Sequence, residues 1–357
     1  MGNTRSSENV QWIWNSSPDP FSKSQPAQWR RFSDIESMMI EGAFQAGKTQ
    51  AILDNDRIDL QKRIQISKTD TKKQRPVKRI IVNQDEIHFR EERFITNPIE
   101  CDRTHGGLYG FVSPFIKETV KHLKLIRDGL PSKNPSIVTM VVDKAVQGIL
   151  DEGQKVGQLQ EAKMLAKRLS AKRQTGFQDV WKCCAYLYSL ESFLFKIINE
   201  TLRVIGSEEH EQIWRNRVPT LGPFCLLLWD NPFNSKPIKA HTVLYRGALV
   251  SDELISRLKK EGPLESRPIH SFQAFTSCTK NRAVAERFGN TLFIMKIQVA
   301  FSIDLHLLSK YPHEEEEVLL PGVTYVINNV QFDSKTKKHL VTLILQQKHN
   351  SKSRILL

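Results

Sequence analysis

The pattern of hydrophobic and polar positions changes twice along the chain. From about residue 105 to 210, apolar side chains recur at steps of three and four residues, which is the spacing of one face of an α-helix. These helical stripes run over 115–126, 138–150, 159–169 and 180–202. Gly129 and Pro131 end the first of them. We expect the stripes to form the core of a helical subdomain rather than a ligand site.

Beyond about residue 240 the apolar residues alternate instead. Residues 292–299 alternate between two faces, as a strand does. The segment 318–320 leads into a turn at Pro321-Gly322, and further strands are predicted for 323–330 and 340–345. Helices followed by a mostly antiparallel sheet predict an α+β domain.

The N-terminal part has a third texture. Residues 10 to 82 are rich in aromatic and strand-forming side chains, with a short helix predicted from Ser37 to Ala46. The next stretch is heavily charged, has no periodicity and precedes Gly106-Gly107, which is typical of a linker. The expected division of the chain is an N-terminal domain over 8–82, a linker over 83–104, a helical subdomain over 105–210 and a strand-rich core over 211–350.

Cysteine usage and terminal sequences predict the compartment. The five cysteines are odd in number and form no CxxC pair, which excludes a disulfide framework or a zinc site and favours a reducing compartment. No apolar run reaches the length of a transmembrane helix, and neither a secretory signal nor a GPI-type tail is expected. We therefore expect an intracellular, cytoplasmic protein that is not secreted.

The net charge of +13 suits an anionic partner, such as a nucleotide, a nucleic acid or an acidic membrane surface. The densest basic run, within 72–79, is expected to be a solvated face, and no specific nucleic acid is predicted. The first six residues match the myristoylation pattern, with Gly2 and Ser6 in place. One acyl chain binds membranes only marginally, so membrane association is expected only if Gly2 is acylated and basic charge assists. An unmodified terminus is the alternative.

Aromatic residues mark the N-terminal domain. Trp12, Trp14 and Trp29 come first, then an Ile58-Asp59-Leu60 strand, Gln65 and a closing basic strand that begins at Arg75. In order and spacing this resembles the WWE family over about seventy residues. The resemblance implies a half-barrel that binds ADP-ribose units, including those of poly-ADP-ribose, in a modified partner protein.

The same resemblance assigns the ligand contacts of this domain. Trp14 would stack on adenine, Gln65 would hydrogen-bond, and Arg75 would bind phosphate. An aromatic face supports a base, and a guanidinium fork matches phosphate oxygens. The family often places an aromatic residue where this chain has Asp56 or Arg57. The alternative is that the tryptophans are core residues and that the domain binds a protein or nothing.

Three short motifs follow in the C-terminal half. They are an apolar strand ending in Arg246-Gly247, a Thr276-Ser277-Cys278-Thr279 stretch, and four glutamates, Glu314 to Glu317, running into Val318-Leu319-Leu320. Together they resemble the Arg-Ser-Glu class of ADP-ribosyltransferases, over roughly residues 155 to 350. Residues 283–288 and 188–203 agree with that class as well. The resemblance implies a helical subdomain packed with a split β-sandwich, which clamps NAD.

The implied reaction transfers one ADP-ribose from NAD, or NADP, to a protein arginine and releases nicotinamide. Positive charge then develops on the ribose, as in glycoside hydrolysis, and a carboxylate against the sugar stabilises it. Glu317 would take this role, with Ser277 orienting it. Arg246 would bind NAD phosphate, next to Gly247. No metal is implied. Cys278 and Thr279 replace the usual threonine and serine, and a thiol is only a weak hydrogen-bond donor.

Acceptor recognition is assigned to the residues before the last strand. The acceptor turn would span 309–314, with Tyr311 as a substrate contact and Glu315 receiving the arginine. Residues two apart on an extended segment point the same way, so Glu315 and Glu317 are expected to face the site together. Four adjacent carboxylates also repel each other, which is expected to raise the pKa of some of them.

The sequence is also compatible with two other functions. The poly-ADP-ribose polymerases have histidine where Arg246 stands, so polymer synthesis is not expected. One alternative is an NAD glycohydrolase, with water as the acceptor. The other is an inactive transferase fold that acts as an ADP-ribose reader through the WWE-like domain.

Overall fold

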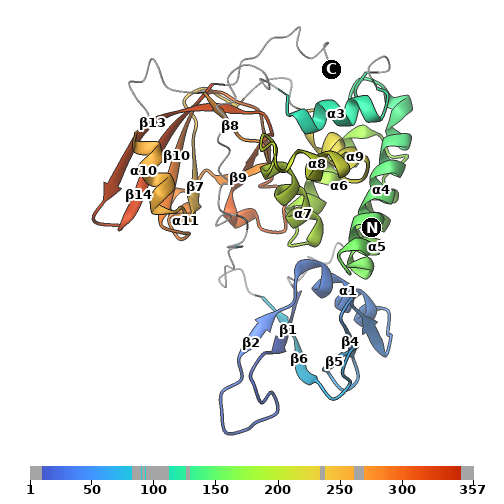
Figure 1. The fold of residues 1–357 in the computed structure, drawn as a ribbon. Coiled ribbons are helices and arrows are strands. Elements are labelled where there is room, and N and C mark those ends of the chain that lie inside the picture. The colour runs from blue at the N-terminus through green and yellow to red at the C-terminus, as the bar shows by residue number, and fades with distance from the viewer. Residues whose placement is uncertain are drawn as a thin grey trace, which may run out of the picture. The chain divides into compact units, whose positions relative to one another are not determined.

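The computed structural model describes residues 10–82, 90, 93, 112–125, 129–233, 238–260 and 269–346. Gly2 and Ser6 of the acylation pattern lie outside the described residues, as does most of the expected linker. The described chain divides into two compact units (Figure 1). One contains the N-terminal domain together with 149–167 and 190–194, and the other contains the remaining described residues.

The N-terminal domain is a six-stranded antiparallel sheet with the order β2-β1-β6-β5-β4-β3. Its elements are β1 (Val10–Asn15), β2 (Trp29–Arg31), α1 (Asp34–Gln45), β3 (Gln50–Ile52), β4 (Asp56–Asp59), β5 (Ile64–Ser67) and β6 (Gln74–Ile81). Helix α1 begins three residues before the expected Ser37 because Ser33 and Glu36 form a capping box.

The core of this sheet domain is built around a buried tryptophan. Trp12 is 1 % exposed and packs among the apolar side chains Phe32, Ile40, Ala51, Leu53, Ile58, Leu60 and Val77. Its indole N–H donates to Glu41 at 2.9 Å, so the polar atom of the ring is satisfied within the core. Trp14 and Trp29 are only half-buried, and Trp14 packs against the edge of this core.

Helices fill the middle of the chain. They are α3 (Pro114–His122), η1 (Pro135–Ile137), α4 (Val138–Lys155), α5 (Leu159–Ser170), α6 (Phe177–Ser189), α7 (Phe193–Arg203), α8 (Glu211–Asn216) and α9 (Val218–Trp229). The helical part therefore continues to Trp229, beyond the limit expected at residue 210. Helix α9 carries no polar face, and its Cys225 to Leu228 are fully buried, so a search for amphipathic stripes does not detect it.

Two glycines let helices approach closely. A Cβ added to Gly148 of α4 would lie 1.9 Å from the carbonyl oxygen of Thr220 in α9. A Cβ on Gly222 of α9 would lie 2.4 Å from the hydroxyl of Thr119 in α3. Only glycine permits both contacts, and these contacts hold α9 between its neighbours.

The C-terminal part is an eight-stranded sheet with the order β11-β12-β9-β7-β10-β14-β13-β8. Its elements are β7 (Val243–Ala248), α10 (Asp252–Lys259), β8 (His270–Ser271), β9 (Thr276–Thr279), α11 (Arg282–Ala285), β10 (Thr291–Val299), β11 (Ser302–Asp304), η3 (Pro312–Glu314), β12 (Glu316–Leu319), β13 (Thr324–Asp333) and β14 (Lys338–Gln346). The pairing is mostly antiparallel, as expected, and only β10 and β14 pair in parallel.

A single residue pair joins the two halves of this sheet. Strands β7 and β9 share only the pair Tyr245 and Thr279, whereas β12 and β9 pair over four residues. The sheet therefore splits beside Arg246, and the small group β11-β12-β9 is separated there from the five strands that follow. Strands from both groups bring the three C-terminal motifs to this split.

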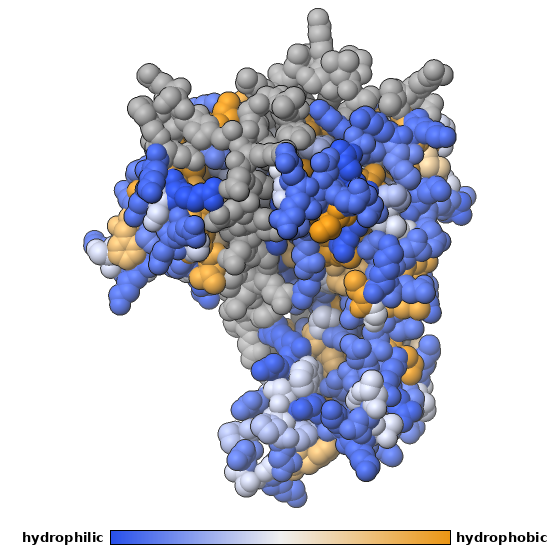
Figure 2. Space-filling view, viewed as in Figure 1, coloured by the Kyte–Doolittle hydropathy of each residue, from blue (hydrophilic) through white to orange (hydrophobic). Residues whose placement is uncertain are grey.

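The face of the molecule in Figure 2 is mainly hydrophilic, with hydrophobic side chains scattered rather than gathered. Within the described ranges, no helix has both the length and the apolar character that crossing a bilayer requires.

Candidate active site

The three C-terminal motifs meet at the split of the sheet. Arg246 of β7 donates from Nη1 to the carbonyl oxygen of Ser277 in β9, at 2.6 Å. Strand β12 pairs with β9, with Glu316 opposite Thr279 and Glu317 opposite Cys278. Residues that are far apart in the sequence are therefore neighbours, as the resemblance implies.

Glycine and cysteine at this point have packing roles. A Cβ on Gly247 would lie 2.2 Å from the carbonyl oxygen of Ala285, so the turn of α11 excludes any side chain there. Cys278 is fully buried, with its sulfur 3.6 Å from that of Met295. Burial raises the pKa of the Cys278 thiol to about 12, so this side chain is a neutral core group. Its weak donor strength therefore matters little to the polar site.

The acidic run is not extended throughout. Glu314 ends the 3₁₀-helix η3, and Glu315 has φ 46° and ψ 43°, in the left-handed region that non-glycine residues seldom adopt. The side chain of Glu315 accepts from Nδ2 of Asn281 at 3.2 Å. Strand geometry begins only at Glu316. The expectation that Glu315 and Glu317 point the same way is therefore wrong in its premise, because the backbone turns between them.

Glu317 is held on one face of β12. Its Oε1 accepts from the Ser302 hydroxyl, and its Oε2 forms an ion pair with Lys280 at 2.8 Å. Lys280 also contacts Asp304 at 2.9 Å. Burial alone would lower the pKa of Lys280, but Glu317 and Asp304 outweigh it and raise that pKa.

Ser277 lies on the opposite face from Glu317. Opposed residues of an antiparallel pair share a face, and Ser277 is opposite Val318. Side chains alternate along the strand, so Glu316 is on the Ser277 face. The structure thus brings Ser277 toward Glu316, while Ser302 and Lys280 contact Glu317.

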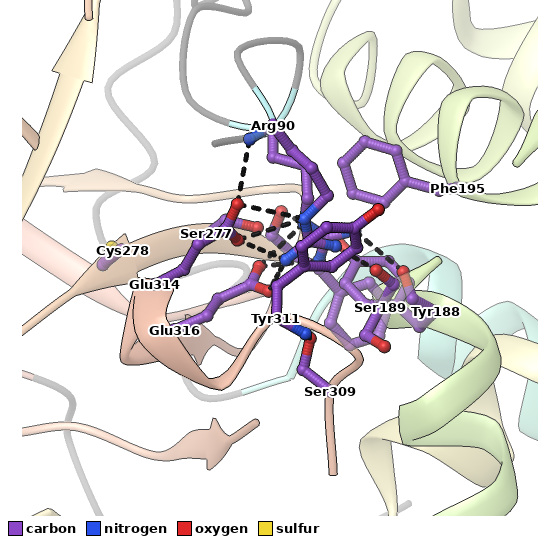
Figure 3. Close-up of polar contacts among 12 residues, drawn as sticks. Arg90, Tyr188, Ser189, Phe195, Ser277, Cys278, Ser309, Tyr311, Glu314 and Glu316 are labelled. Carbon is purple, nitrogen blue, oxygen red and sulfur yellow. Dashed lines mark hydrogen bonds and ion pairs between the residues drawn. The ribbon is translucent and has the colours of Figure 1, made fainter. Parts of the chain in front are cut away.

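Two arginines from the expected linker are buried here. Arg90 is 0 % exposed and Arg93 is 2 % exposed. Arg90 Nε donates to both oxygens of Glu314, at 3.2 and 3.1 Å, and Nη2 donates to Glu314 and, at 2.9 Å, to Glu316. Its Nη1 donates to the carbonyl of Ser189 (Figure 3).

Arg93 binds the other carboxylate oxygen of Glu316. Its Nε and Nη2 donate to Glu316 Oε1 at 2.9 and 2.6 Å, and its Nη1 donates to the Tyr188 carbonyl at 2.9 Å. Arg246 Nη1 donates to the backbone carbonyl of Arg93 at 3.1 Å. Arg90 and Arg93 therefore bind the buried carboxylates of Glu314 and Glu316. The backbone carbonyl of Arg93 also accepts a hydrogen bond from Arg246 of β7.

Aromatic rings complete these two contacts. The Arg90 guanidinium lies 4.2 Å from the centre of the Tyr311 ring (Figure 3), and Arg93 lies 4.1 Å from that of Phe195. Arginine over an aromatic face is attracted by the ring's quadrupole, more so where water is excluded. Tyr311, the predicted substrate contact, is 7 % exposed, and its ring faces the guanidinium of Arg90.

Buried charge partners set the protonation of the cluster. Burial alone would raise the pKa of Glu316, but Arg93 and Arg90 outweigh it and hold that pKa below its ordinary value. Glu316 is therefore not one of the glutamates whose pKa repulsion within the acidic run raises, because the two arginines outweigh that repulsion. Burial lowers the pKa of the Arg246 guanidinium to about 10, so this half-buried group stays charged at neutral pH.

The predicted ADP-ribose contacts of the N-terminal domain also lie together. Arg75 lies 5.4 Å from the centre of the Trp14 ring and donates to the carbonyls of Asn15 and Ser17, both at 2.9 Å. Gln65 is opposite Arg75 in the sheet and donates to Asp56 at 2.8 Å. Its Oε1 is buried and has no hydrogen-bond partner among the described residues.

Sequence reasoning missed Arg90, Arg93, Lys280 and Ser302. The two arginines belong to an unperiodic charged stretch, where nothing in the local pattern distinguishes them from the glutamates beside them. Lys280 and Ser302 stand next to expected strand positions and carry no motif. In the described part of the chain, no cluster of three or more histidine, cysteine or acidic side chains could hold a metal ion.

Solved structures of ADP-ribosyltransferases resemble the chain weakly. HopU1 of Pseudomonas syringae pv. Tomato DC3000 is 18 % identical with a TM-score of 0.39, covering 51 % of this chain and 87 % of its own. Plx2a, a toxin from Paenibacillus larvae, is 18 % identical with a TM-score of 0.38, covering 52 % and 94 %. An ADP-ribosyltransferase from Clostridium botulinum is 14 % identical with a TM-score of 0.37, covering 51 % and 94 %.

Family models give the firmer result. The WWE domain model matches residues 10–79, and the model of NAD:arginine ADP-ribosyltransferase matches residues 151–353, more than half of the chain. No curated protein matches significantly. The predicted α+β fold, with a WWE-like half-barrel followed by an ADP-ribosyltransferase domain, agrees with these two matches. The chain thus carries an N-terminal WWE domain and belongs to the NAD:arginine ADP-ribosyltransferase family.

Proposed function

We propose that this protein transfers a single ADP-ribose from NAD to arginine side chains of other proteins and releases nicotinamide. One observation carries the choice of acceptor. The segment that leads into β12 binds guanidinium groups, with Glu314 and Glu316 on the nitrogens of Arg90 and Tyr311 over its plane. Carboxylates and an aromatic face are the chemistry that recognises arginine.

The chemical step needs an anion against the ribose. Cleavage of the bond between nicotinamide and ribose develops positive charge on the sugar, and a carboxylate there lowers the barrier. We assign this role to Glu317, which Ser302 and Lys280 hold in place. Arg246, charged at neutral pH and placed at the split of the sheet, would bind the phosphates through its fork of donors.

The acceptor needs a base or an ion pair, because a guanidinium is protonated at neutral pH. A carboxylate beside it orients the nucleophilic nitrogen toward the sugar and takes up its proton as the new bond forms. Glu315 stands between Glu314 and Glu316, the two glutamates that bind guanidinium groups, in its own left-handed turn. We assign the acceptor proton to Glu315.

The test uses purified full-length chain, NAD labelled in its adenylate part, and agmatine as the arginine acceptor. Label on agmatine together with nicotinamide release is expected for the wild type. Glu317→Ala is expected to lose both, whereas Glu315→Ala loses transfer and keeps nicotinamide release with water as acceptor. Glu211→Ala, on the exposed face of α8, is the matched control. Nicotinamide release without labelled agmatine in the wild type would instead favour a glycohydrolase.

We propose in addition that the WWE domain binds ADP-ribose units on partner proteins. The support is the grouping of Trp14, Gln65 and Arg75, together with the buried Gln65 oxygen that has no partner among the described residues. A buried acceptor without a donor costs free energy unless a ligand donates to it. Fluorescence titration with poly-ADP-ribose tests this, and unchanged affinity in Gln65→Ala would contradict it.

A further inference from the structure

We propose that Asp304 binds the guanidinium of the acceptor arginine beside Glu317, and that the ammonium of Lys280 holds this position until an acceptor arrives. This inference rests on the proposed function, because Glu317 is the residue assigned there to the ribose. It goes further by naming a residue that selects the acceptor. Asp304 belongs to none of the three C-terminal motifs.

Asp304 and Glu317 lie on the same face of the sheet. They stand directly opposite each other in the antiparallel pair of β11 and β12, where side chains are about 4.5–5.5 Å apart at Cβ. Like charges at such a distance repel each other unless a cation lies between them. The acceptor nitrogen has to reach the sugar that Glu317 faces, so its guanidinium has to approach on this face.

Lys280 now supplies the cation. Its Nζ lies 2.9 Å from Oδ2 of Asp304 and 2.8 Å from Oε2 of Glu317. Burial lowers the pKa of Lys280, but the two carboxylates outweigh burial and raise it, so the ammonium is charged. A guanidinium carries the same single charge and can therefore take this position without changing the net charge of the site.

Exposure makes this cation replaceable. The side chain of Asp304 is 55 % exposed and that of Lys280 is 42 % exposed, whereas that of Glu317 is 6 % exposed. A cationic side chain that enters from solvent therefore meets Asp304 first and Glu317 at the bottom. The flexible stem of Lys280 can move its ammonium into water as the acceptor enters.

One buried atom favours a ligand over a permanent ion pair. Oε2 of Glu317 accepts no hydrogen bond from the described residues, and Lys280 reaches it only as an ion-pair contact. A buried acceptor without a donor costs free energy. Asp304 is already oriented, since its Oδ1 accepts from the backbone N–H of His306 at 2.9 Å. A guanidinium presents a planar fork of N–H donors, which can serve Oδ2 of Asp304 and Oε2 of Glu317 together.

The transfer step balances with this placement. The guanidinium nitrogen forms a bond to the ribose carbon as the bond to nicotinamide breaks, and nicotinamide leaves with that electron pair. One guanidinium proton goes to Glu315, as assigned above, so Asp304 stays ionised throughout. The backbone of Glu315 is close to this position, because its carbonyl accepts from the N–H of Lys280 at 3.4 Å.

The first test measures the agmatine KM and kcat of the full chain at saturating NAD. Asp304→Asn is expected to raise the KM about tenfold to a hundredfold, the effect of losing one charged hydrogen bond, and to change kcat less. Asp304→Glu should recover part of the loss. Asp143→Asn, which removes a carboxylate from another exposed ion pair, is the matched control and should leave the KM unchanged. An unchanged KM in folded Asp304→Asn would overturn the inference.

The second test needs neither a variant nor catalysis. Acetic anhydride modifies neutral amines, and peptide mass spectrometry reads its reaction at Lys280. Ethylguanidine, added to the wild type, is expected to release Lys280 and speed this reaction, by about tenfold for each pKa unit that the freed amine loses. Tetramethylammonium, a cation without N–H donors, should have little effect. Lys155, paired with Glu152 at 2.8 Å, is the internal reference. A Lys280 rate that stays constant over the whole ethylguanidine titration would contradict the inference.

The two proposals fail in different ways. If ethylguanidine releases Lys280 but the wild type never releases nicotinamide, the enzymatic proposal falls and the guanidinium position at Asp304 stands. If agmatine is labelled but neither the KM of Asp304→Asn nor the modification of Lys280 responds as described, transfer to arginine stands and the role of Asp304 falls.

Discussion

An arginine lies over an aromatic ring in both domains, and the two cases differ in what neutralises the charge. In the WWE domain, Arg75 over Trp14 is half-buried and donates to backbone carbonyls, and it forms no ion pair with the described residues. In the transferase domain, Arg90 over Tyr311 is fully buried against two carboxylates. The first arginine keeps its positive charge for an anionic ligand. The second is itself bound as a ligand would be.

The largest expected effect of this difference is on stability. Arg93→Ala leaves Glu316 buried with part of its ion pairing gone, so the free energy of unfolding should fall by about 3–5 kcal/mol. Arg75→Ala removes two hydrogen bonds to backbone carbonyls but leaves no buried charge unpaired, so it should lower the free energy of unfolding less, by about 1–2 kcal/mol. Urea unfolding of both variants measures the contrast. Equal losses would remove the distinction between the two arginines.

The next effect is on catalysis. Glu317→Gln removes the charge proposed to face the ribose and should lower kcat for nicotinamide release by about 10²–10³-fold. Glu316→Gln, on the opposite face of the strand, should lower kcat less and act mainly on the agmatine KM. Steady-state kinetics on both variants decides between them. A larger loss of kcat in Glu316→Gln would move the ribose-facing role to the Ser277 side of β12.

On the WWE side, the expected effect is on binding. Arg75→Ala should weaken poly-ADP-ribose affinity by about 1.5–3 kcal/mol, the size of a charged hydrogen bond. Lys78→Ala, which removes a cation 4.1 Å from the Trp29 ring, is the control and should change affinity little. Calorimetric titration measures both. A loss confined to Lys78→Ala would place the ligand on the Trp29 side of the sheet.

The smallest effect is a pH dependence of the transferase domain alone. The folded pKa of Glu316 lies below its ordinary value of 4.5. This glutamate therefore stabilises the fold fully above that value and stops doing so as the pH falls through the folded pKa. Urea unfolding from about pH 6 to about pH 3 should show a shallower loss in Glu316→Gln than in the wild type. An identical slope would mean that Glu316 is not held by the arginines in solution.

Local signals in the sequence predicted much of the fold. The 3.6-residue stripes predicted α4, α5 and α6, the alternation at 292–299 predicted β10, and the Trp12 region predicted the WWE sheet. Each depends on near neighbours in the chain, so a sequence window contains the evidence. Helix α9 has no polar face, so its sequence alone does not distinguish it from a buried strand or a buried loop.

The acidic run shows where such windows stop being sufficient. Its four glutamates look equivalent in the sequence, yet no two have the same set of partners. Glu314 binds Arg90, Glu315 binds Asn281, Glu316 binds both Arg90 and Arg93, and Glu317 binds Lys280. The turn at Glu315 decides which side each carboxylate faces.

By itself the sequence determined the residue types and their order. The tryptophans of the N-terminal domain come first, then Arg246, Ser277 and the glutamates ahead of an apolar strand. Tertiary structure decided which charges meet. Arg90 and Glu314 are 224 positions apart, and a Coulomb interaction depends on distance in space and on the exclusion of water, neither of which a one-dimensional pattern contains.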